Sequence, residues 1–390
     1  MKKQRLTVLL AFSLLLVVAT VIGCGTLGVD GFLIPVGGGE EFAFVVGGQN
    51  DCNCDFSIGV YSVDPDTGKL TPSPGSPFST GFSGGGTSFI DVDPNSKFVF
   101  VPQGTQGGVA VYSVGSNGDL TAVAGSPFVL GVADAPFSAK LDPTGKFLYV
   151  TDRANGEIYA ASVGSDGKLT LIGAGGLDLP GFPYQIIMDP QGRFLYVSVC
   201  IEGEGCESAI DGFKIDATTG ALTAMPGNPS FITGNGGRSG TIDSTGKFLL
   251  LAEVDDDDVR VYSIDQATGA LTQVGNPVPS DSGAFHVVEA KVGGTTYMAV
   301  NNYYAGNITV FTFDAGSGTL APISGNPFAV ANDPHFAAVD PSGRFGYIAS
   351  AESAIVGFTL NTNGTPTEIP GSPFSTQVPD HPNQIVITKK

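Results

Sequence analysis

The chain has 390 residues, a formal net charge of −19, 56 glycines, 26 prolines and no tryptophan. Such an acidic surface argues against nucleic acid as a partner, because nucleic-acid binding needs a basic footprint. Only 14% of the residues are charged, and the many turn formers between alternating apolar stretches predict an all-β protein rather than a helical one.

The first 23 residues form a predicted export signal. Three basic residues within the first five positions precede the apolar run Leu6–Ile22, which is short for a membrane-spanning helix. The run ends in Val-Ile-Gly-Cys24, which resembles the lipobox of bacterial lipoproteins. The resemblance implies a lipid on Cys24, an envelope location on the periplasmic or outer side, and membrane contact through this anchor only. An uncleaved anchor or a soluble secreted protein is the alternative.

Residues 24–40 are Gly-rich and are expected to form a short tether, and residues 41–390 are predicted to form one repeated domain. The stretch Phe137–Asp152 shows the repeating unit, which is a hairpin. Its first residues alternate as in a half-buried strand, Asp142-Pro-Thr-Gly145 predicts a tight turn, and Phe147–Val150 predicts a second strand. Copies of the hairpin begin at Ile90, Ile186, Ile242 and Ala338.

Two further strands follow the hairpin in most units. The third is exemplified by Val111-Tyr-Ser-Val114, and the fourth is a short leucine strand before a closing signal such as Gly125-Ser-Pro-Phe128. The aromatic residue that opens each second strand recurs about every fifty residues, at Phe42, Phe98, Phe147, Phe194, Phe248, Tyr297 and Phe345. Four strands per repeat at this period predict a seven-bladed β-propeller with four antiparallel strands per blade.

The first unit begins at its second strand, so its innermost strand is missing from the N-terminal end. The segment Pro382–Thr388 aligns with Pro136–Asp142, the first strand of the third unit. We therefore expect the C-terminal strand to complete blade one and close the ring, which removes the exposed edges of an open array.

The repeated residues also indicate a family. The absence of tryptophan excludes WD repeats. The hairpin Asp-Pro-x-Gly-Lys/Arg-Phe-Leu-Tyr-Val, followed by Val-Tyr-Ser-Val and Gly-x-Leu-Thr, resembles the lactonase-type seven-bladed propellers, which include bacterial 6-phosphogluconolactonase and the related YVTN surface-layer repeats. The resemblance covers residues 41–390 and implies His, Arg and Glu at the channel mouth, and an activity on sugar lactones or similar carboxylic esters.

The repeat register points to one end of the channel, where first strands begin and second strands end. Arg238, His286 and His335 fall at first-strand starts in consecutive blades, and Glu253 and Glu352 fall at second-strand ends. A His or Glu can activate water and an Arg can hold an anion, so these five are the candidate catalytic residues. The alternative is that both histidines satisfy backbone groups at the strand starts.

An acidic run and two cysteine pairs complete the candidates. The acidic run is a candidate Ca²⁺ site in which water would complete the coordination shell, or else a solvated acidic turn. It consists of Asp255, Asp256, Asp257 and Asp258. No cofactor is required by the expected chemistry. Cys200 with Cys206 and Cys52 with Cys54 are candidate disulfides of an exported chain, while cross pairing or a zinc site would need distant loops to meet.

The sequence leaves two functions open. One is an envelope-anchored hydrolase of a lactone or similar ester. The other is a non-catalytic surface propeller that binds carbohydrate or an envelope protein, which the lack of a clear nucleophile and the strongly acidic surface favour.

Overall fold

The computed structural model describes residues 40–47, 55–83, 89–104, 107–131, 135–201, 206–226, 231–330, 332–350, 354–376, 378 and 382–390. It divides the chain into two units, Met1–Glu40 and Glu41–Lys390. Cys24, Cys52, Cys54 and Glu352 lie outside the described residues, so what the sequence predicts for them stays a prediction. The described part of the chain holds no helix that is long and apolar enough to span a membrane.

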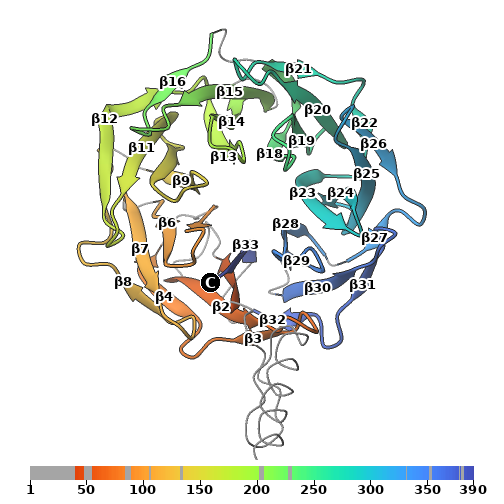
Figure 1. The fold of residues 1–390 in the computed structure, drawn as a ribbon, viewed down its shortest axis with the longest axis horizontal. Coiled ribbons are helices and arrows are strands. Elements are labelled where there is room, and N and C mark those ends of the chain that lie inside the picture. The colour runs from red at the N-terminus through yellow and green to blue at the C-terminus, as the bar shows by residue number, and fades with distance from the viewer. Residues whose placement is uncertain are drawn as a thin grey trace, which may run out of the picture. The chain divides into compact units, whose positions relative to one another are not determined.

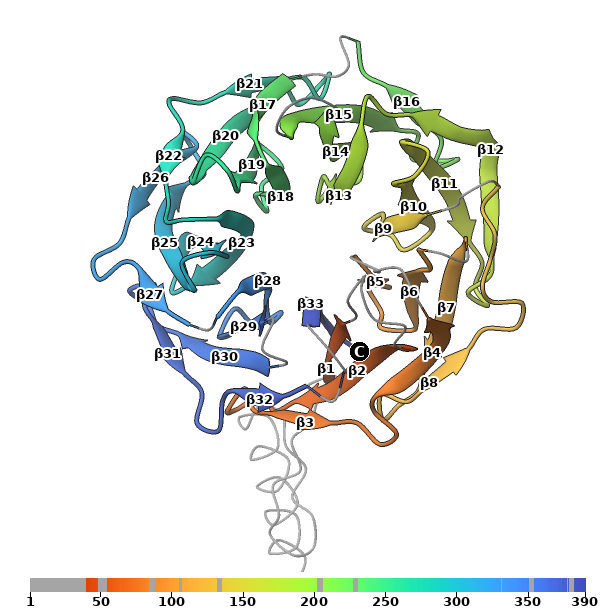
Figure 2. The ribbon, with the colours of Figure 1, turned by 180° about the vertical axis from the view of Figure 1, so that it is seen from behind.

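The described residues of the second unit form strands and turns only, and the strands pair into seven antiparallel sheets. The sheets follow one another around a central axis, each with its first strand innermost (Figure 1), and the view from behind shows the same order (Figure 2). The prediction of an all-β, seven-bladed propeller with four antiparallel strands per blade is confirmed.

The strand bounds follow the predicted units. Blade one comprises β33 (Pro382–Lys389), β1 (Glu41–Gly47), β2 (Asp55–Val63), β3 (Leu70–Pro72) and β4 (Phe78–Ser83). Blade two comprises β5 (Asp91–Val92), β6 (Phe98–Pro102), β7 (Val109–Val114) and β8 (Leu120–Ala122). Blade three comprises β9 (Pro136–Leu141), β10 (Phe147–Asp152), β11 (Glu157–Val163) and β12 (Leu169–Asp178).

The remaining blades have the same order. Blade four comprises β13 (Phe182–Met188), β14 (Phe194–Ile201), β15 (Glu207–Ile215), β16 (Leu222–Ala224) and β17 (Phe231–Asn235). Blade five comprises β18 (Gly237–Ile242), β19 (Phe248–Glu253), β20 (Asp258–Ile264), β21 (Leu271–Gln273) and β22 (Val278–Pro279). Blade six comprises β23 (Ala284–Val292), β24 (Thr295–Asn302), β25 (Asn307–Asp314), β26 (Thr319–Pro322) and β27 (Phe328–Ala329). Blade seven comprises β28 (Pro334–Val339), β29 (Phe345–Ser350), β30 (Ala354–Leu360), β31 (Pro366–Glu368) and β32 (Phe374–Ser375).

The two ends of the repeated domain meet in one sheet. Strand β33 pairs with β1 in antiparallel register from Glu41↔Lys389 to Gly47↔Pro382. The predicted closure of the ring by the C-terminal strand is therefore confirmed. It gives β1 a partner on both sides, so the first blade has no unpaired inner strand.

The Gly-Ser/Asn-Pro signal interrupts the outer strand of a blade. In blade one, β3 and β4 both pair with β2, one on each side of the turn at Ser76-Pro77. At the interruption, the Ser76 hydroxyl accepts the N–H of Val60 at 2.9 Å, and Ser126, Asn326 and Ser372 accept the corresponding N–H in their own blades. The side chain thus replaces the backbone acceptor that the break removes.

Neighbouring blades are joined by an aromatic ring under a glycine. The aromatic residue that opens each second strand lies beneath a glycine in the turn after the third strand of the next blade. The pairs are Phe42–Gly118, Phe98–Gly167, Phe147–Gly220, Phe194–Gly269, Phe248–Gly318, Tyr297–Gly364 and Phe345–Gly68, and in each a Cβ on the glycine would come closer than 3.0 Å to the ring. Each of these glycines also has a positive φ, which side chains with a Cβ rarely adopt. Three tyrosines strengthen the joint, since Tyr149, Tyr196 and Tyr347 donate to the carbonyls of Gly220, Gly269 and Gly68.

The joint can be tested with two glycines of blade three. Gly167 has φ +81° and would place a Cβ 2.7 Å from the Phe98 ring, whereas Gly173 has φ +87° and nothing within 4 Å. We expect Gly167→Ala to destabilise the protein by about 1–3 kcal/mol more than Gly173→Ala, because only the first adds overpacking to the strained backbone. Urea unfolding monitored by circular dichroism measures both, and equal losses would show that the ring contact contributes nothing.

Candidate functional site

A β-bulge at the start of most first strands aims one side chain at the channel mouth. The pairing register skips one residue there, for example between the pairs Gly237↔Glu253 and Ser239↔Ala252 of blade five. A bulge of this kind turns the extra side chain away from the pleat. The register skips Phe137, Arg238 and Phe285 in blades three, five and six. In blades four and seven two residues lie opposite one, and alignment with the other blades puts Tyr184 and His335 at the bulge position.

This register corrects the expectation for His286. The residue pairs with Asn301, and the bulge residue of blade six is Phe285. His286 is therefore equivalent to Ser138, Gln185 and Ser239, one position further along the strand than His335. Blade six reaches its first strand through Gly283-Ala284 rather than through a proline, and the sequence placed the position one residue too late.

His286 has the role of a structural acceptor between blades. Its Nδ1 accepts the N–H of Ala337 in blade seven at 3.4 Å. In the same position Gln384, Ser138 and Gln185 accept an N–H from the next blade, donated by Ile90, Ile186 and Gly240. His286 is 8% exposed, and burial lowers its pKa to about 3. A neutral imidazole that accepts through Nδ1 suits this role, and the alternative raised for His286 from the sequence fits it better than catalysis.

A cationic group occupies the mouth over blades three to five. The guanidinium of Arg238 lies 4.4 Å from the Tyr184 ring centre, and that of Arg153 lies 4.8 Å from the Tyr184 and Phe137 ring centres. Arg153 Nη2 also donates to the Tyr184 hydroxyl at 3.4 Å. Neither arginine forms a salt bridge with any residue that the structure describes, and Arg238 Nε is buried without a hydrogen-bond partner there. Two positive charges thus face one point of an acidic protein.

An aromatic group with the imidazole of His335 occupies the mouth over blades six and seven. The His335 ring stacks on Tyr303, with centroids 5.0 Å apart and planes at 8°, and on Phe285 at 5.5 Å. The Nδ2 of Asn301 donates to the His335 carbonyl at 3.1 Å, which fixes the backbone of the bulge. The Ser198 hydroxyl of blade four likewise donates to the Arg238 carbonyl of blade five at 3.0 Å.

Further aromatic rings lie deeper in the channel than the two groups at the mouth, and we call them the floor. Phe89 of blade two contacts Phe336 of blade seven with ring centroids 4.8 Å apart, and Phe336 contacts His286 at 4.7 Å. Beneath the floor, a cavity of about 220 Å³ is lined among others by Asp91, Lys140, Gln185 and Gln384. Lys140 pairs with Asp91 at 3.1 Å, and both glutamines accept backbone N–H groups between blades. The polar groups of this cavity are therefore engaged in holding the ring together.

Glu253 does not reach the mouth. Its side chain is completely buried beside Ser208 and Gly237, and neither carboxylate oxygen has a well-aligned hydrogen-bond partner among the described residues. Burial raises the pKa of Glu253 to about 7, although the nearby Thr233 hydroxyl and Arg260 charge oppose the shift. Blade six separates Glu253 from His335. Of the four predicted catalytic residues that the structure describes, Arg238 and His335 lie in separate clusters, and His286 and Glu253 are buried. Glu352 lies outside the described residues, so its role stays a prediction.

The acidic run Asp255–Asp258 is split among several partners. Asp256 binds Arg260 at 2.7 Å and Asn235, Asp258 binds Arg260 at 3.2 Å, and Asp257 accepts the N–H of Gly283 at 2.6 Å. In the part of the chain that the structure describes, no group of three acidic, His or Cys side chains could hold a metal ion. Asp256 and Asp258 share Arg260 while Asp257 contacts Gly283, so the four carboxylates do not form one ligand set.

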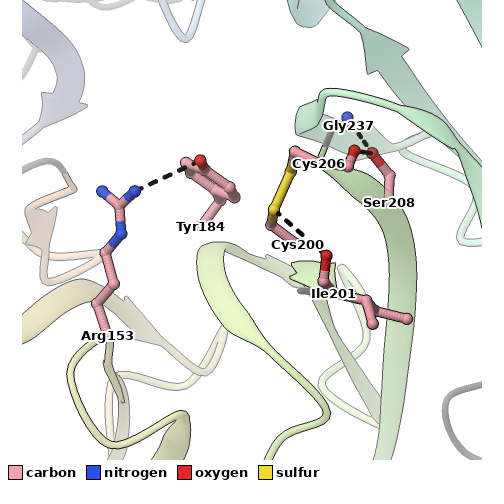
Figure 3. The surroundings of a disulfide bond; sticks show 7 residues. All are labelled: Arg153, Tyr184, Cys200, Ile201, Cys206, Ser208 and Gly237. Atoms are coloured by element: carbon pink, nitrogen blue, oxygen red, sulfur yellow. Dashed lines mark hydrogen bonds between the residues drawn. A yellow bond between two sulfur atoms is a disulfide. The ribbon is translucent and has the colours of Figure 1, made fainter. Parts of the chain in front are cut away.

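Two residues of the mouth, Arg153 and Tyr303, were absent from the sequence candidates. Each follows the last residue of a second strand, after Asp152 in β10 and Asn302 in β24. The same repeat register would have found them if it had been carried one residue beyond the strand ends. The disulfide candidate Cys200–Cys206 is bonded, with the Cα atoms 5.2 Å apart, and lies near Arg153 and Tyr184 (Figure 3).

The strands define a seven-bladed propeller, with one cationic and one aromatic group at the mouth of its channel. Residues 43–172 and 181–289 match the family described as "Lactonase, 7-bladed beta-propeller". The chain belongs to this lactonase propeller family, as its repeats led us to expect. No curated protein sequence gives a significant match.

Solved structures share the fold at low sequence identity. A "putative 6-phosphogluconolactonase" from Bacteroides fragilis is 17% identical with a TM-score of 0.72, over 90% of this chain and 98% of that one. The periplasmic gluconolactonase of Pseudomonas aeruginosa is 17% identical with a TM-score of 0.65, over 89% and 99%. Kuenenia stuttgartiensis hydrazine synthase is 20% identical with a TM-score of 0.50, over 73% and 79%. At such identity the likeness establishes the fold and not the activity.

The assignment of His286 to the scaffold predicts which substitution the protein tolerates. We expect His286→Gln to keep the stability of the protein, because glutamine is the acceptor at two equivalent positions, and His286→Ala to lose about 1–3 kcal/mol through an unpaired buried N–H. The pH profile gives a second readout. The unfolded chain protonates His286 below its ordinary pKa of 6.5, while the folded chain stays neutral down to about 3, so wild-type stability falls between these values as the pH falls.

This fall should be smaller in His286→Gln, because glutamine has no proton to bind. Thermal unfolding between pH 3.5 and pH 8 measures both effects. Equal destabilisation by glutamine and alanine would contradict the acceptor role.

Proposed function

We propose that the channel mouth binds a small carbohydrate-derived anion, such as a sugar acid, its phosphate ester or the corresponding lactone. The observation that carries the proposal is the pair Arg153 and Arg238 on the Tyr184 ring, with no acidic partner among the residues that the structure describes. A guanidinium binds a carboxylate or phosphate through two parallel hydrogen bonds. The stacked rings of His335 and Tyr303 offer an apolar face for the ring of the ligand.

Membership of the lactonase propeller family supports the carbohydrate class. Two of the similar structures carry names that refer to gluconolactone or 6-phosphogluconolactone. Both compounds combine a six-membered ring with hydroxyl groups, and the phosphorylated form adds a dianion. A ligand of this class matches the arginine pair on one side of the mouth and the aromatic rings on the other. The alternative, a platform for an envelope protein, has no comparable feature among the described residues.

Lactone hydrolysis is the second candidate function, and His335 is the observation that favours it. Of the candidate bases, only this imidazole is both described and aimed at the mouth, because His286 and Glu253 are buried. A neutral imidazole can take a proton from water as the water attacks the lactone carbonyl, and Arg238 or Arg153 can stabilise the oxyanion that forms. Collapse of the oxyanion then breaks the ring C–O bond, and the imidazolium returns its proton to the departing ring oxygen.

Binding is tested by calorimetric titration with 6-phosphogluconate. We expect Arg153→Met and Arg238→Met each to weaken the affinity by roughly tenfold or more, since each removes charge-assisted hydrogen bonds. Arg344→Met is the matched control, because Arg344 also lies over an aromatic ring, Phe345 at 4.9 Å, and bonds to the carbonyls of Pro65 and Asp66 in the neighbouring blade. Loss of binding in the control alone, or undetectable binding by the wild-type protein, would refute the proposed ligand.

Hydrolysis is tested by following the opening of glucono-δ-lactone and its 6-phosphate. If the protein is catalytic, His335→Ala should lower kcat by about 10²-fold or more and leave the affinity for 6-phosphogluconate within a small factor. His286→Gln should leave both unchanged. A wild-type rate no greater than the spontaneous one would leave binding as the function.

A further inference from the structure

Among the strand pairs that the structure describes, the hairpin of blade four extends beyond those of the other blades. In blade three the last pair between the second and third strands is Asp152↔Glu157, and its equivalent in blade four is Val199↔Ala209. Strands β14 and β15 continue for two more pairs, through Cys200↔Ser208 and Ile201↔Glu207. The Cys200–Cys206 disulfide closes this extension at the mouth end of the sheet.

One side of the extension holds the strand that carries Tyr184. Strand β13 begins at Phe182, which pairs with Cys200, and Gly181 packs directly on the Cys200 carbonyl. Tyr184 is the bulge residue that follows two positions later. The start of β13 therefore depends on where Cys200 lies, and without the extension it would have no partner beyond Val199.

The other side of the extension holds the strand that carries Arg238. The Gly236 N–H donates to the Cys206 carbonyl at 2.9 Å. The Gly237 N–H donates to the Ser208 hydroxyl, and both contacts lie at the start of β18. Figure 3 shows the disulfide between the Tyr184 side and the Ser208–Gly237 contact. Consecutive backbone groups just before Arg238 are thus fixed by residues on the Cys206 side of the bridge.

We propose that the Cys200–Cys206 disulfide is the positioning element of the cationic half of the mouth. By joining the two edges of the extended hairpin, it holds the starts of β13 and β18 at one distance from each other. Tyr184 and Arg238 then face each other at 4.4 Å, and the arginine pair is preorganised for an anion. The inference rests on the proposed function for its ligand, but the positioning itself is a property of the free protein.

The physical reason is the short length of the extension. Only two residue pairs lie beyond Val199, and the end of a hairpin opens locally at little free-energy cost. A covalent link between its edges removes those open conformations. A site whose groups move by even a fraction of an ångström loses much of its complementarity, so the bridge should act on affinity more than on global stability.

The positioning is tested first without ligand, by hydrogen exchange of the amides of Gly236 and Gly237 and of the start of β13. We expect Cys200→Ser/Cys206→Ser to raise exchange at these amides and to leave β28 (Pro334–Val339), the equivalent strand of blade seven, unchanged. Cys52→Ser/Cys54→Ser is the control and should leave all of them unchanged. Unaltered exchange at Gly236 and Gly237 in the first variant would overturn the inference, whatever the protein binds.

A second measurement covers the case in which the Cys200 variant does not fold. Dithiothreitol is added to folded Cys52→Ser/Cys54→Ser protein, where it converts the bridge to two thiols and itself becomes a cyclic disulfide. The same rise in exchange at Gly236 and Gly237 is expected, and its absence after verified reduction would overturn the inference.

The effect on the site is measured by titration with 6-phosphogluconate. Loss of the bridge should weaken binding to the wild-type site by roughly fivefold or more. In protein that already carries Arg238→Met, loss of the bridge should weaken binding by a smaller factor. Equal affinity with and without the bridge would overturn the link to the site. If wild-type protein does not bind this probe, the proposed function fails, while the exchange experiment still decides whether the bridge positions Tyr184 and Arg238.

Discussion

The aromatic ring beneath the glycine of the next blade is the contact on which the whole ring depends. It occurs at every junction between blades, including the one from Phe345 of blade seven to Gly68 of blade one. Each partner is constrained for a different reason. The ring fills the space where a Cβ would be, and the glycine alone adopts the positive φ that brings its backbone over the ring. Because every blade gives a ring and receives one, no blade can shift without breaking two joints.

The innermost strands add a second set of links. Side chains of Gln384, Ser138, Gln185 and His286 accept an N–H from the following blade. The bulge residues directly before Ser138, Gln185 and His286, which are Phe137, Tyr184 and Phe285, point to the mouth instead. A difference of one residue therefore decides whether a side chain serves the scaffold or the site, as period-two alternation requires. This is why His286 and His335, which look equivalent in the sequence, have different environments.

The mouth differs in charge from the rest of the protein. The chain carries a net charge of −19, yet Arg153 and Arg238 meet on one tyrosine ring at the channel entrance. Long-range repulsion of anions by the acidic surface is screened within about 8–10 Å at physiological salt, so a local pair of guanidinium groups can still hold an anion. The extended hairpin of blade four is the only part of this arrangement without a counterpart in the other blades among the described strand pairs, and it borders both Tyr184 and Arg238.

The sequence by itself determined the fold, the number of blades and the closing strand, because turn signals, strand alternation and the aromatic anchors are local and recur with a fixed period. It also placed Arg238 and His335 at the mouth, since both directly follow the turn into a first strand. Tertiary structure alone decided the rest. The bulge register exchanged His286 for Phe285, the packing between blades buried Glu253, and the approach of blades three, four and five brought Arg153 and Arg238 onto Tyr184. Those relations depend on contacts between residues tens of positions apart, which no local pattern records.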